Sequence, residues 1–154
     1  MKSEYIQPFI KASQHALQHL CQIDIAAGSP ALFETDRDFH DVSAIIGLAG
    51  EVTGAVALSF TTAGCLAASQ AFTGIASSTV DDVAVDAIGE LVNVIAGNAK
   101  EDLIQFKIYI SLPNIVFGHH DLRFPRDTPA ITVPMQSRQT EDFNLLVALK
   151  TPPQ

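Results

Sequence analysis

Several features that decide where a protein works are missing from this sequence of 154 residues. No apolar run approaches the ~18 residues that a membrane-spanning helix needs. The N-terminal segment "MKSEYIQPFIKASQ" mixes charged with apolar residues and has no apolar centre of the kind found in signal peptides. We therefore expect a cytoplasmic protein.

Positive charge is also scarce. The 9 Lys and Arg residues are outnumbered by 17 Asp and Glu residues, which gives a formal net charge of −8, and the basic residues form no cluster. Nucleic acids and anionic membranes both require a basic surface on the protein that binds them. Neither is an expected partner.

Cysteine is limited to Cys21 and Cys65, and each lies within an apolar pattern of helical spacing. This setting favours two buried thiols over a disulfide or a redox pair, and a cytoplasmic location favours the same interpretation. We therefore expect no disulfide in the fold.

Motifs of common nucleotide-binding and hydrolytic sites are absent as well. "GLAGEVTG" lies in a predicted hairpin rather than ahead of a helix, so it does not fit a phosphate-binding loop. Ser111 lacks the G-x-S-x-G surroundings of a serine hydrolase nucleophile. No repeat, low-complexity tract or linker divides the chain, so we expect one domain over residues 1–154.

The hydrophobic pattern predicts a helix first and then a hairpin. Apolar residues within 4–22 have helical spacing, after which "AAGSP" and "ETDRD" predict turn and loop. Within residues 41–60, two runs rich in Val, Ile and Ala flank "AGEVTG". This arrangement predicts an antiparallel hairpin with its turn near Gly50 and Glu51.

The rest of the chain predicts two more helices and three more strands. A short helix should begin at Thr61 or Thr62 and end at Gly74, and Thr79 opens a weak capping box for a longer helix. The predicted strands are "FKIYISLPNIVFG", ended by Pro113, "AITVPMQS" and "DFNLLVALK". We therefore expect an α/β fold of the α+β type, a two-layer sandwich with long helices packed on a largely antiparallel sheet.

The predicted helix that contains "DAIGELVNVIAGNAK", residues 86–100, has two contrasting faces. One stripe is apolar and should face the sheet: Ala84, Ile88, Leu91, Val92, Ile95 and Ala99. The opposite stripe is polar or small: Asp82, Asp86, Glu90, Asn93, Gly97 and Lys100. A solvated helix face is the ordinary interpretation of such a stripe.

Two features of the polar stripe are locally unfavourable. Asp82 and Asp86, and Asp86 and Glu90, are like charges at i,i+4, which repel by a few tenths of a kcal/mol. Gly89 and Gly97 each cost ~1 kcal/mol relative to alanine in a helix interior. A local cost without a visible structural return indicates function. We interpret the glycines as positions where another molecule can approach the backbone.

Glu90 and Asn93 stand one helical turn apart, so a carboxylate and an amide should project together. Such a pair can bind a cation through the carboxylate and orient a water molecule through the amide. The spacing does not decide which reaction results.

Histidines are the other candidates for a site. His15 and His19 have the i,i+4 spacing of a two-point metal site. They lie opposite an apolar stripe and lack the Glu of H-E-x-x-H, which favours a solvated face. "GHHDLRF" places His119, His120 and Asp121 in a predicted loop, and no further ligand is evident. We predict no metal site.

The region around the polar stripe resembles a known family. "GELVNVIAGNAK", preceded by "DVAVDAI" and followed by "ISLPNIVFG", is similar to the CheX branch of the CheC/CheX/FliY chemotaxis phosphatases. "SAIIGLAGEVTGAVALSF" resembles the glycine-rich β-hairpin of that family, and the resemblance extends over residues 5–150. Its most specific part is Asp86, Glu90 and Asn93, with Asn98 and Pro113 in supporting positions.

The resemblance implies a CheC/CheX-like fold and a protein phosphatase that hydrolyses the aspartyl phosphate of a CheY-like response-regulator receiver. Asn93 would orient the attacking water, and Glu90 would contact the active-site lysine of the receiver. The receiver would supply Mg²⁺, so no cofactor of the chain's own is implied. This division of roles is chemically reasonable, because phosphoryl transfer depends on positioning and charge stabilisation, and an amide both donates and accepts at any working pH.

The resemblance also implies a wider binding surface. Asp86 would support docking, Gly89 and Gly97 would let loops of the receiver reach the helix, and Pro113 would belong to the same surface. CheX-like members carry one active helix per chain and form dimers through sheet edges. E-x-x-N occurs on a predicted helix only once, at Glu90 and Asn93, so a CheX-like homodimer is the implied assembly.

Two functions stay open at this point, the phosphatase and a non-catalytic binding domain. A CheX-like domain could bind a receiver or another signalling partner without hydrolysing anything, and the sequence does not identify the receiver or the pathway. Receiver domains are often acidic too, so a net charge of −8 offers no long-range steering towards them. Docking must therefore depend on local complementarity.

Overall fold

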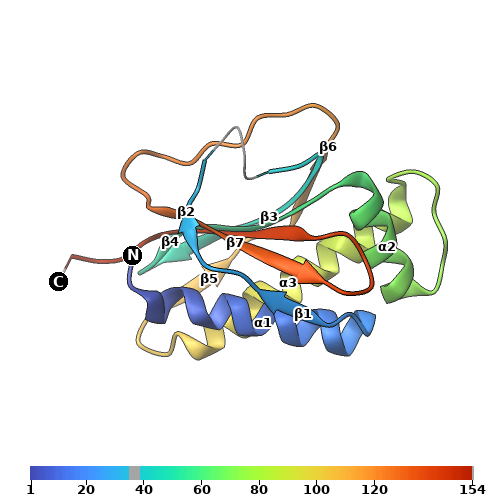
Figure 1. Ribbon diagram of the computed structural model, residues 1–154. Helices are drawn as coiled ribbons and strands as arrows, with labels where there is room; N and C mark the ends of the chain where they lie inside the picture. The colour runs from blue at the N-terminus through green and yellow to red at the C-terminus, as the bar shows by residue number, and fades with distance from the viewer. Residues whose placement is uncertain (35–38, 154) are drawn as a thin grey trace.

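The computed structural model describes residues 1–34 and 39–153 (Figure 1). Two long helices lie beneath an antiparallel sheet, and a shorter helix lies at one end of the molecule. The helices are α1 (Ser3–Cys21), α2 (Thr62–Thr73) and α3 (Asp82–Asp102). The strands are β1 (Ile25–Ala27), β2 (Ala31–Leu32), β3 (Val42–Gly50), β4 (Thr53–Phe60), β5 (Ile108–Ile110), β6 (Asn114–Phe117), β7 (Ala130–Ser137) and β8 (Phe143–Lys150). The predicted α+β sandwich is confirmed.

The centre of the sheet is formed by β8, β4 and β3. The strand order is β1-β7-β8-β4-β3-β5, with β2 also paired with β7 and β6 also paired with β3. The predicted hairpin turn is confirmed, because β3 ends at Gly50 and β4 begins at Thr53. Gly54 has a φ of +144°, and a Cβ there would lie 1.9 Å from the carbonyl oxygen of Ala148. Only glycine therefore lets β8 approach β4 so closely.

The core lies between the helices and the sheet. Phe9 and Leu17 of α1 pack there with Ile46 of β3 and Leu145 of β8, all of them buried. The apolar stripe predicted on α3 is buried along its whole length: Ala84, Ile88, Leu91, Val92, Ile95 and Ala99. This burial fixes which side of α3 remains outside.

Both later helices begin at a capping side chain. The Thr61 hydroxyl accepts the backbone N–H of Gly64 at 3.0 Å, and Gly74 ends α2 with a φ of 75°, as predicted. The predicted capping box at Thr79 is wrong. Asp81 precedes the first residue of α3, and its carboxylate accepts the N–H of Ala84 at 3.0 Å. A carboxylate next to the positive end of the helix is the better placed cap.

The single strand predicted for "FKIYISLPNIVFG" is two strands, β5 and β6, both paired with β3. Leu48 pairs with Ile110 and Ile45 with Asn114, so two residues of β3 lie opposite three residues, 111–113, of the outer segment. One extra residue on one strand is a β-bulge. Pro113 therefore does not end the strand, because pairing resumes at Asn114 after the bulge.

The sequence patterns missed β1 and β2, which fall where turns and loops were predicted. Both are short, both pair with β7, and their residues are mostly exposed. Strands of this kind have no hydrophobic alternation that a sequence pattern could detect. Residues 35–38 of the loop predicted at "ETDRD" lie outside the described residues.

The two thiols are buried and free, as predicted. Burial raises the pKa of Cys21 and of Cys65 to about 11. Within residues 1–34 and 39–153, none of the helices combines the length and apolar character needed to cross a membrane.

Candidate functional site on helix α3

The outer side of α3 carries the predicted pair. Asp86 and Glu90 are exposed and Asn93 is half-buried, and their spacing places all three on the side opposite the core. Gly97 lies one turn beyond Asn93, and a Cβ built on it would meet no atom within 4 Å. The helix therefore presents two carboxylates and an amide beside an open stretch of backbone.

Gly89 has a different environment from Gly97. Gly89 is buried, and a Cβ there would lie 3.5 Å from Cγ of Pro113. The proline ring thus rests against the glycine, so the backbone of α3 meets the outer segment of the sheet directly. The two glycines have separate roles: Gly89 brings Pro113 onto the helix, and Gly97 leaves space outside it.

A depression of about 420 Å³ lies where α3 meets β6. Its lining residues come from the helix and from the segment that follows the bulge: Val85, Asp86, Gly89, Glu90, Pro113, Asn114 and Ile115. Asn93 does not line it and lies one turn further along α3 than Glu90. The depression therefore contains Asp86, Gly89, Glu90 and Pro113 of the predicted residues, with Asn93 and Gly97 beyond it on the helix.

The bulge holds Pro113 in place through Ser111. Gly47 of β3 donates its N–H to the Ser111 hydroxyl at 2.9 Å, and Ser111 returns its own N–H to the Gly47 carbonyl at 2.9 Å. The Ser111 hydroxyl also donates to the carbonyl of Leu112 at 2.9 Å. Ser111 has a structural role, which agrees with the absence of a serine hydrolase motif around it.

The polar side chains of the site have no partners within the part of the chain that the structure describes. Neither the carboxylates of Asp86 and Glu90 nor the amide of Asn93 takes part in a hydrogen bond or an ion pair there. Lys100 lies on the same stripe, but its Nζ donates to the carbonyl oxygen of Ile108 at 3.2 Å. Two negative charges at i,i+4 are thus left uncompensated next to a free amide.

The histidines form no comparable site. Nε2 of His120 forms a hydrogen bond with the Ser43 hydroxyl at 2.8 Å, and Nδ1 forms one with the Gly118 carbonyl oxygen at 2.9 Å. His15 and His19 stack on each other at 4.0 Å on the exposed side of α1. Among the described residues, His, Cys, Asp and Glu side chains form no group of three or more that could hold a metal ion.

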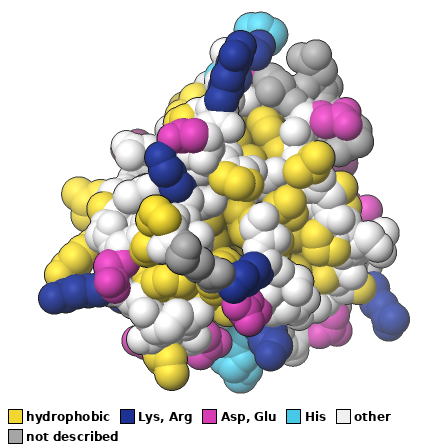
Figure 2. Space-filling view, turned by 90° about the vertical axis from the view of Figure 1, so that its left-hand side faces the viewer, with side chains coloured by type: hydrophobic (Ala, Val, Ile, Leu, Met, Phe, Trp, Pro, Cys, Tyr) yellow, Lys and Arg dark blue, Asp and Glu magenta, His cyan; other side chains and the backbone are white. Residues whose placement is uncertain are grey.

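Charge is mixed rather than segregated on the face of the molecule that Figure 2 shows. In Figure 2, the end of the molecule near both termini shows Lys and Arg side chains scattered among acidic and hydrophobic ones. Lys150 pairs with Asp127 and Arg123 with Asp121, so these positive charges are already matched. On this face the basic side chains form no continuous patch of the kind that nucleic acids require.

Comparison with known proteins assigns the chain to a family. The family model described as "Chemotaxis phosphatase CheX" matches residues 42–136, which is more than half of the chain and includes all of α3, β5 and β6. The chain belongs to the CheX family. The resemblance predicted from the sequence is confirmed.

Individual relatives agree in length and fold. The CheY-P phosphatase CheX of Thermotoga maritima is 24% identical over 154 residues, which cover 98% of this chain and 99% of that protein. A CheC-like superfamily protein from Shewanella sp. PV-4 superposes with a TM-score of 0.88 at 23% identity, over 97% of this chain and 99% of that one. The CheX–CheY–BeF3–Mg²⁺ complex from Borrelia burgdorferi matches with a TM-score of 0.83 at 24% identity, over 95% and 97%. The two structures show that the fold is shared.

Some residues of the depression were not predicted from the sequence. Val85, Asn114 and Ile115 line it together with the predicted residues. The position of Asn114 and Ile115 depends on the bulge, because a regular strand through Pro113 would continue in a different register. The available signal was a proline within an otherwise apolar strand, which is typical of an edge strand or a bulge.

Proposed function

We propose that this chain is a phosphatase that hydrolyses the aspartyl phosphate of a CheY-like receiver domain and so ends a chemotaxis or two-component signal. The observation that carries the proposal is the unpartnered pair Glu90 and Asn93 on the outer side of α3, in a chain of the CheX family. An exposed carboxylate and a half-buried amide without partners in the described chain are free to meet groups of another protein.

Asn93 is the residue to which we assign the reaction itself. Its amide would lie beside the aspartyl phosphate, accept a hydrogen bond from the attacking water and hold that water in line with the phosphorus. An amide does not titrate, so this function needs no particular protonation state. Positioning of this kind is the main contribution that a protein makes to phosphoryl transfer.

Glu90 would anchor the helix in register. One turn from Asn93, its carboxylate is placed to pair with the active-site lysine of the receiver. The charge on Glu90 would then be matched only in the complex, because no described residue of this chain pairs with it. Truncation of one partner in a desolvated charge pair weakens binding strongly.

The remaining predicted residues would form the surface around this pair. Asp86 lies one turn before Glu90 in the depression and supports docking. Gly97 leaves the open backbone that a loop of the receiver can approach, and Gly89 with Pro113 forms the floor between α3 and β6. Mg²⁺ would come with the receiver, whose carboxylates and phosphoryl oxygens are the hard ligands that this ion prefers.

The assembly and location that we propose follow the family. Residues 1–154 act as one phosphatase domain in the cytoplasm, and two copies form a homodimer through a sheet edge. β1 is a short outer strand at the end of the sheet opposite β5, and a second copy would extend the sheet at this edge.

The test adds the purified chain to a phosphorylated, Mg²⁺-bound CheY-type receiver from the same cell and measures phosphate release. We expect release to exceed the receiver's own decay. Release at the rate of unassisted decay would overturn the phosphatase assignment. If the chain still bound the receiver, that result would identify a binding domain without catalysis.

A further inference from the structure

Two large apolar side chains stand exposed next to the depression. Leu112, in the bulge beside Pro113, is 84% exposed, and Phe117, at the end of β6, is 54% exposed. Pro113 and Ile115, which line the depression, lie between them in the chain. We refer to Leu112 and Phe117 as the β6 ridge.

The bulge explains why Leu112 is exposed, and Phe117 lies at the end of β6. Alternation along β6 places Phe117 on the same sheet face as Ile115, which packs against the core. The extra residue in segment 111–113 lets Pro113 rest on Gly89 while Leu112 remains in solvent. Exposure of such apolar side chains has a free-energy cost, and a group of them beside a polar site is typical of a binding surface.

The negative charge of the site favours an apolar contact with the receiver. The chain has a net charge of −8, and Asp86 and Glu90 add uncompensated negative charge at the site itself. An acidic receiver would be repelled at long range, so the short-range pair of Glu90 with the receiver lysine needs support from contacts that do not depend on charge. Burial of apolar surface provides such a charge-independent contact.

A second copy of this chain is a poor occupant for the same surface. Addition of a strand requires a continuous row of backbone donors and acceptors. The outer segment interrupts that row, because Pro113 has no N–H and the bulge shifts the register there. An interrupted edge discourages strand pairing and leaves its side chains available to a different partner.

We propose that the β6 ridge is the apolar part of the receiver-docking surface. In this arrangement Leu112 and Phe117 pack on apolar side chains that lie beside the phosphorylated aspartate of the receiver, while Glu90 and Asn93 reach the aspartate itself. The inference deepens the proposed phosphatase function and rests on it. It adds the ridge to the docking contacts that Glu90 and Gly97 provide, and it leaves catalysis to Asn93.

The experiment compares Leu112→Ser and Phe117→Ser with a matched control, Ile104→Ser. Ile104 is 88% exposed and lies in the turn after α3, outside the depression. Because the three side chains are largely solvent-exposed, the variants should fold normally, which thermal unfolding checks. Steady-state kinetics with the phosphorylated receiver give KM and kcat, and titration with a receiver carrying Mg²⁺ and BeF3, a stable phosphoryl mimic, gives Kd. Light scattering after size exclusion gives the oligomeric state.

Each ridge variant should raise KM and Kd about five- to tenfold, the usual effect of removing an apolar contact from an interface, and leave kcat unchanged. Ile104→Ser should match the wild type in all three quantities. Ridge variants with wild-type KM and Kd would overturn the ridge proposal while the phosphatase function stands. A change in oligomeric state with KM unchanged would assign the ridge to a second copy and overturn it too. A wild-type chain that neither binds the receiver nor accelerates release would refute the proposed function and the ridge with it.

Discussion

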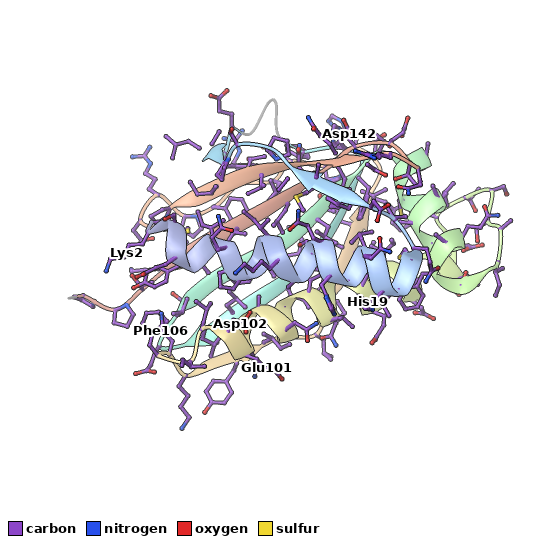
Figure 3. The ribbon with its side chains drawn as sticks, turned by 60° about the horizontal axis from the view of Figure 1, so that its bottom comes forward. Lys2, His19, Glu101, Asp102, Phe106 and Asp142 are labelled. Carbon is purple, nitrogen blue, oxygen red and sulfur yellow. The ribbon has the colours of Figure 1, made fainter. Side chains whose placement is uncertain are left out.

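Helices α1 and α3 cover the same face of the sheet side by side, yet their outer sides differ in composition (Figure 3). α1 contains no glycine, its Glu4 pairs with Lys2 at 3.9 Å, and His15 stacks on His19. α3 contains two glycines and leaves two carboxylates and an amide without partners in the described chain. The two helices pack on the same sheet but differ in their exposed side chains, and this difference is one reason why we propose α3 as the functional helix.

The segments that flank the two helices also differ. α1 is flanked by β1, and the Gln14 amide donates to the carbonyl of Ile25 at 3.2 Å. α3 is flanked by the bulge, where Pro113 rests on Gly89. In Figure 3, Phe106 lies in the connection between the end of α3 and the start of β5. The irregular edge thus lies beside the helix that carries the unpartnered groups.

The largest expected effect on receiver binding is at Glu90. Glu90→Ala should lower kcat/KM for the phosphorylated receiver on the order of 30-fold or more, mainly through KM, because a charge on the receiver would lose its partner. Glu4→Ala on α1 is the matched change and should alter kcat/KM less than about twofold, since exposed ion pairs contribute little. Equal losses in the two variants would remove the distinction between the helices.

A smaller but more specific effect is expected at Gly97. Gly97→Leu should raise KM about tenfold because it fills the space where the receiver approaches, while the unfolding free energy rises by up to about 1 kcal/mol from helix propensity. Gln18→Leu places the same side chain on the exposed side of α1 and should leave KM unchanged. If Gly97→Leu had wild-type KM, the open stretch of α3 would not be part of the binding surface. Urea titration and steady-state kinetics measure the two quantities.

Much of this comparison could be predicted from local sequence patterns. The periodicity of α3 assigned its buried and exposed sides, and the residues around Gly50 and Gly74 indicated where a hairpin turns and where a helix ends. The contact between Gly89 and Pro113 could not be predicted, since it joins two segments whose relative position depends on the whole sheet. The bulge was missed for a related reason: a proline in an apolar run can end a strand or interrupt it, and only pairing with β3 decides between them.

The start of α3 offers a test of stability rather than activity. The pKa of Asp81 is lowered, mainly because its carboxylate accepts the backbone N–H of Ala84. The folded state therefore favours the ionised form, and the stabilisation is present above the ordinary pKa of aspartate and lost as pH falls through the lowered value. Asp81→Ala should lower Tm by a few degrees at about pH 7 and by less at about pH 3. An equal difference at both pH values would show that the charge of Asp81 does not matter.

The smallest effect is expected at the thiols. Burial raises the pKa of Cys21 and Cys65 to about 11, so at about pH 8 very little thiolate is present and neither side chain is accessible. A thiol reagent should not label the native chain within minutes, and should label both cysteines in denaturant. Rapid labelling of Cys21 alone would indicate that α1 opens locally. The two helices would then differ in local stability as well as in composition.

The central claim is that Asn93 on α3 carries out the hydrolysis and that docking depends on other residues. It is tested most directly by measuring phosphate release from a saturating phosphorylated receiver with Asn93→Ala, alongside Gln18→Ala on α1 as the matched amide. We predict that Asn93→Ala binds the receiver loaded with Mg²⁺ and BeF3 within about threefold of the wild type but loses on the order of 100-fold in release rate. Gln18→Ala should keep the full rate. Wild-type release by Asn93→Ala would contradict the assignment.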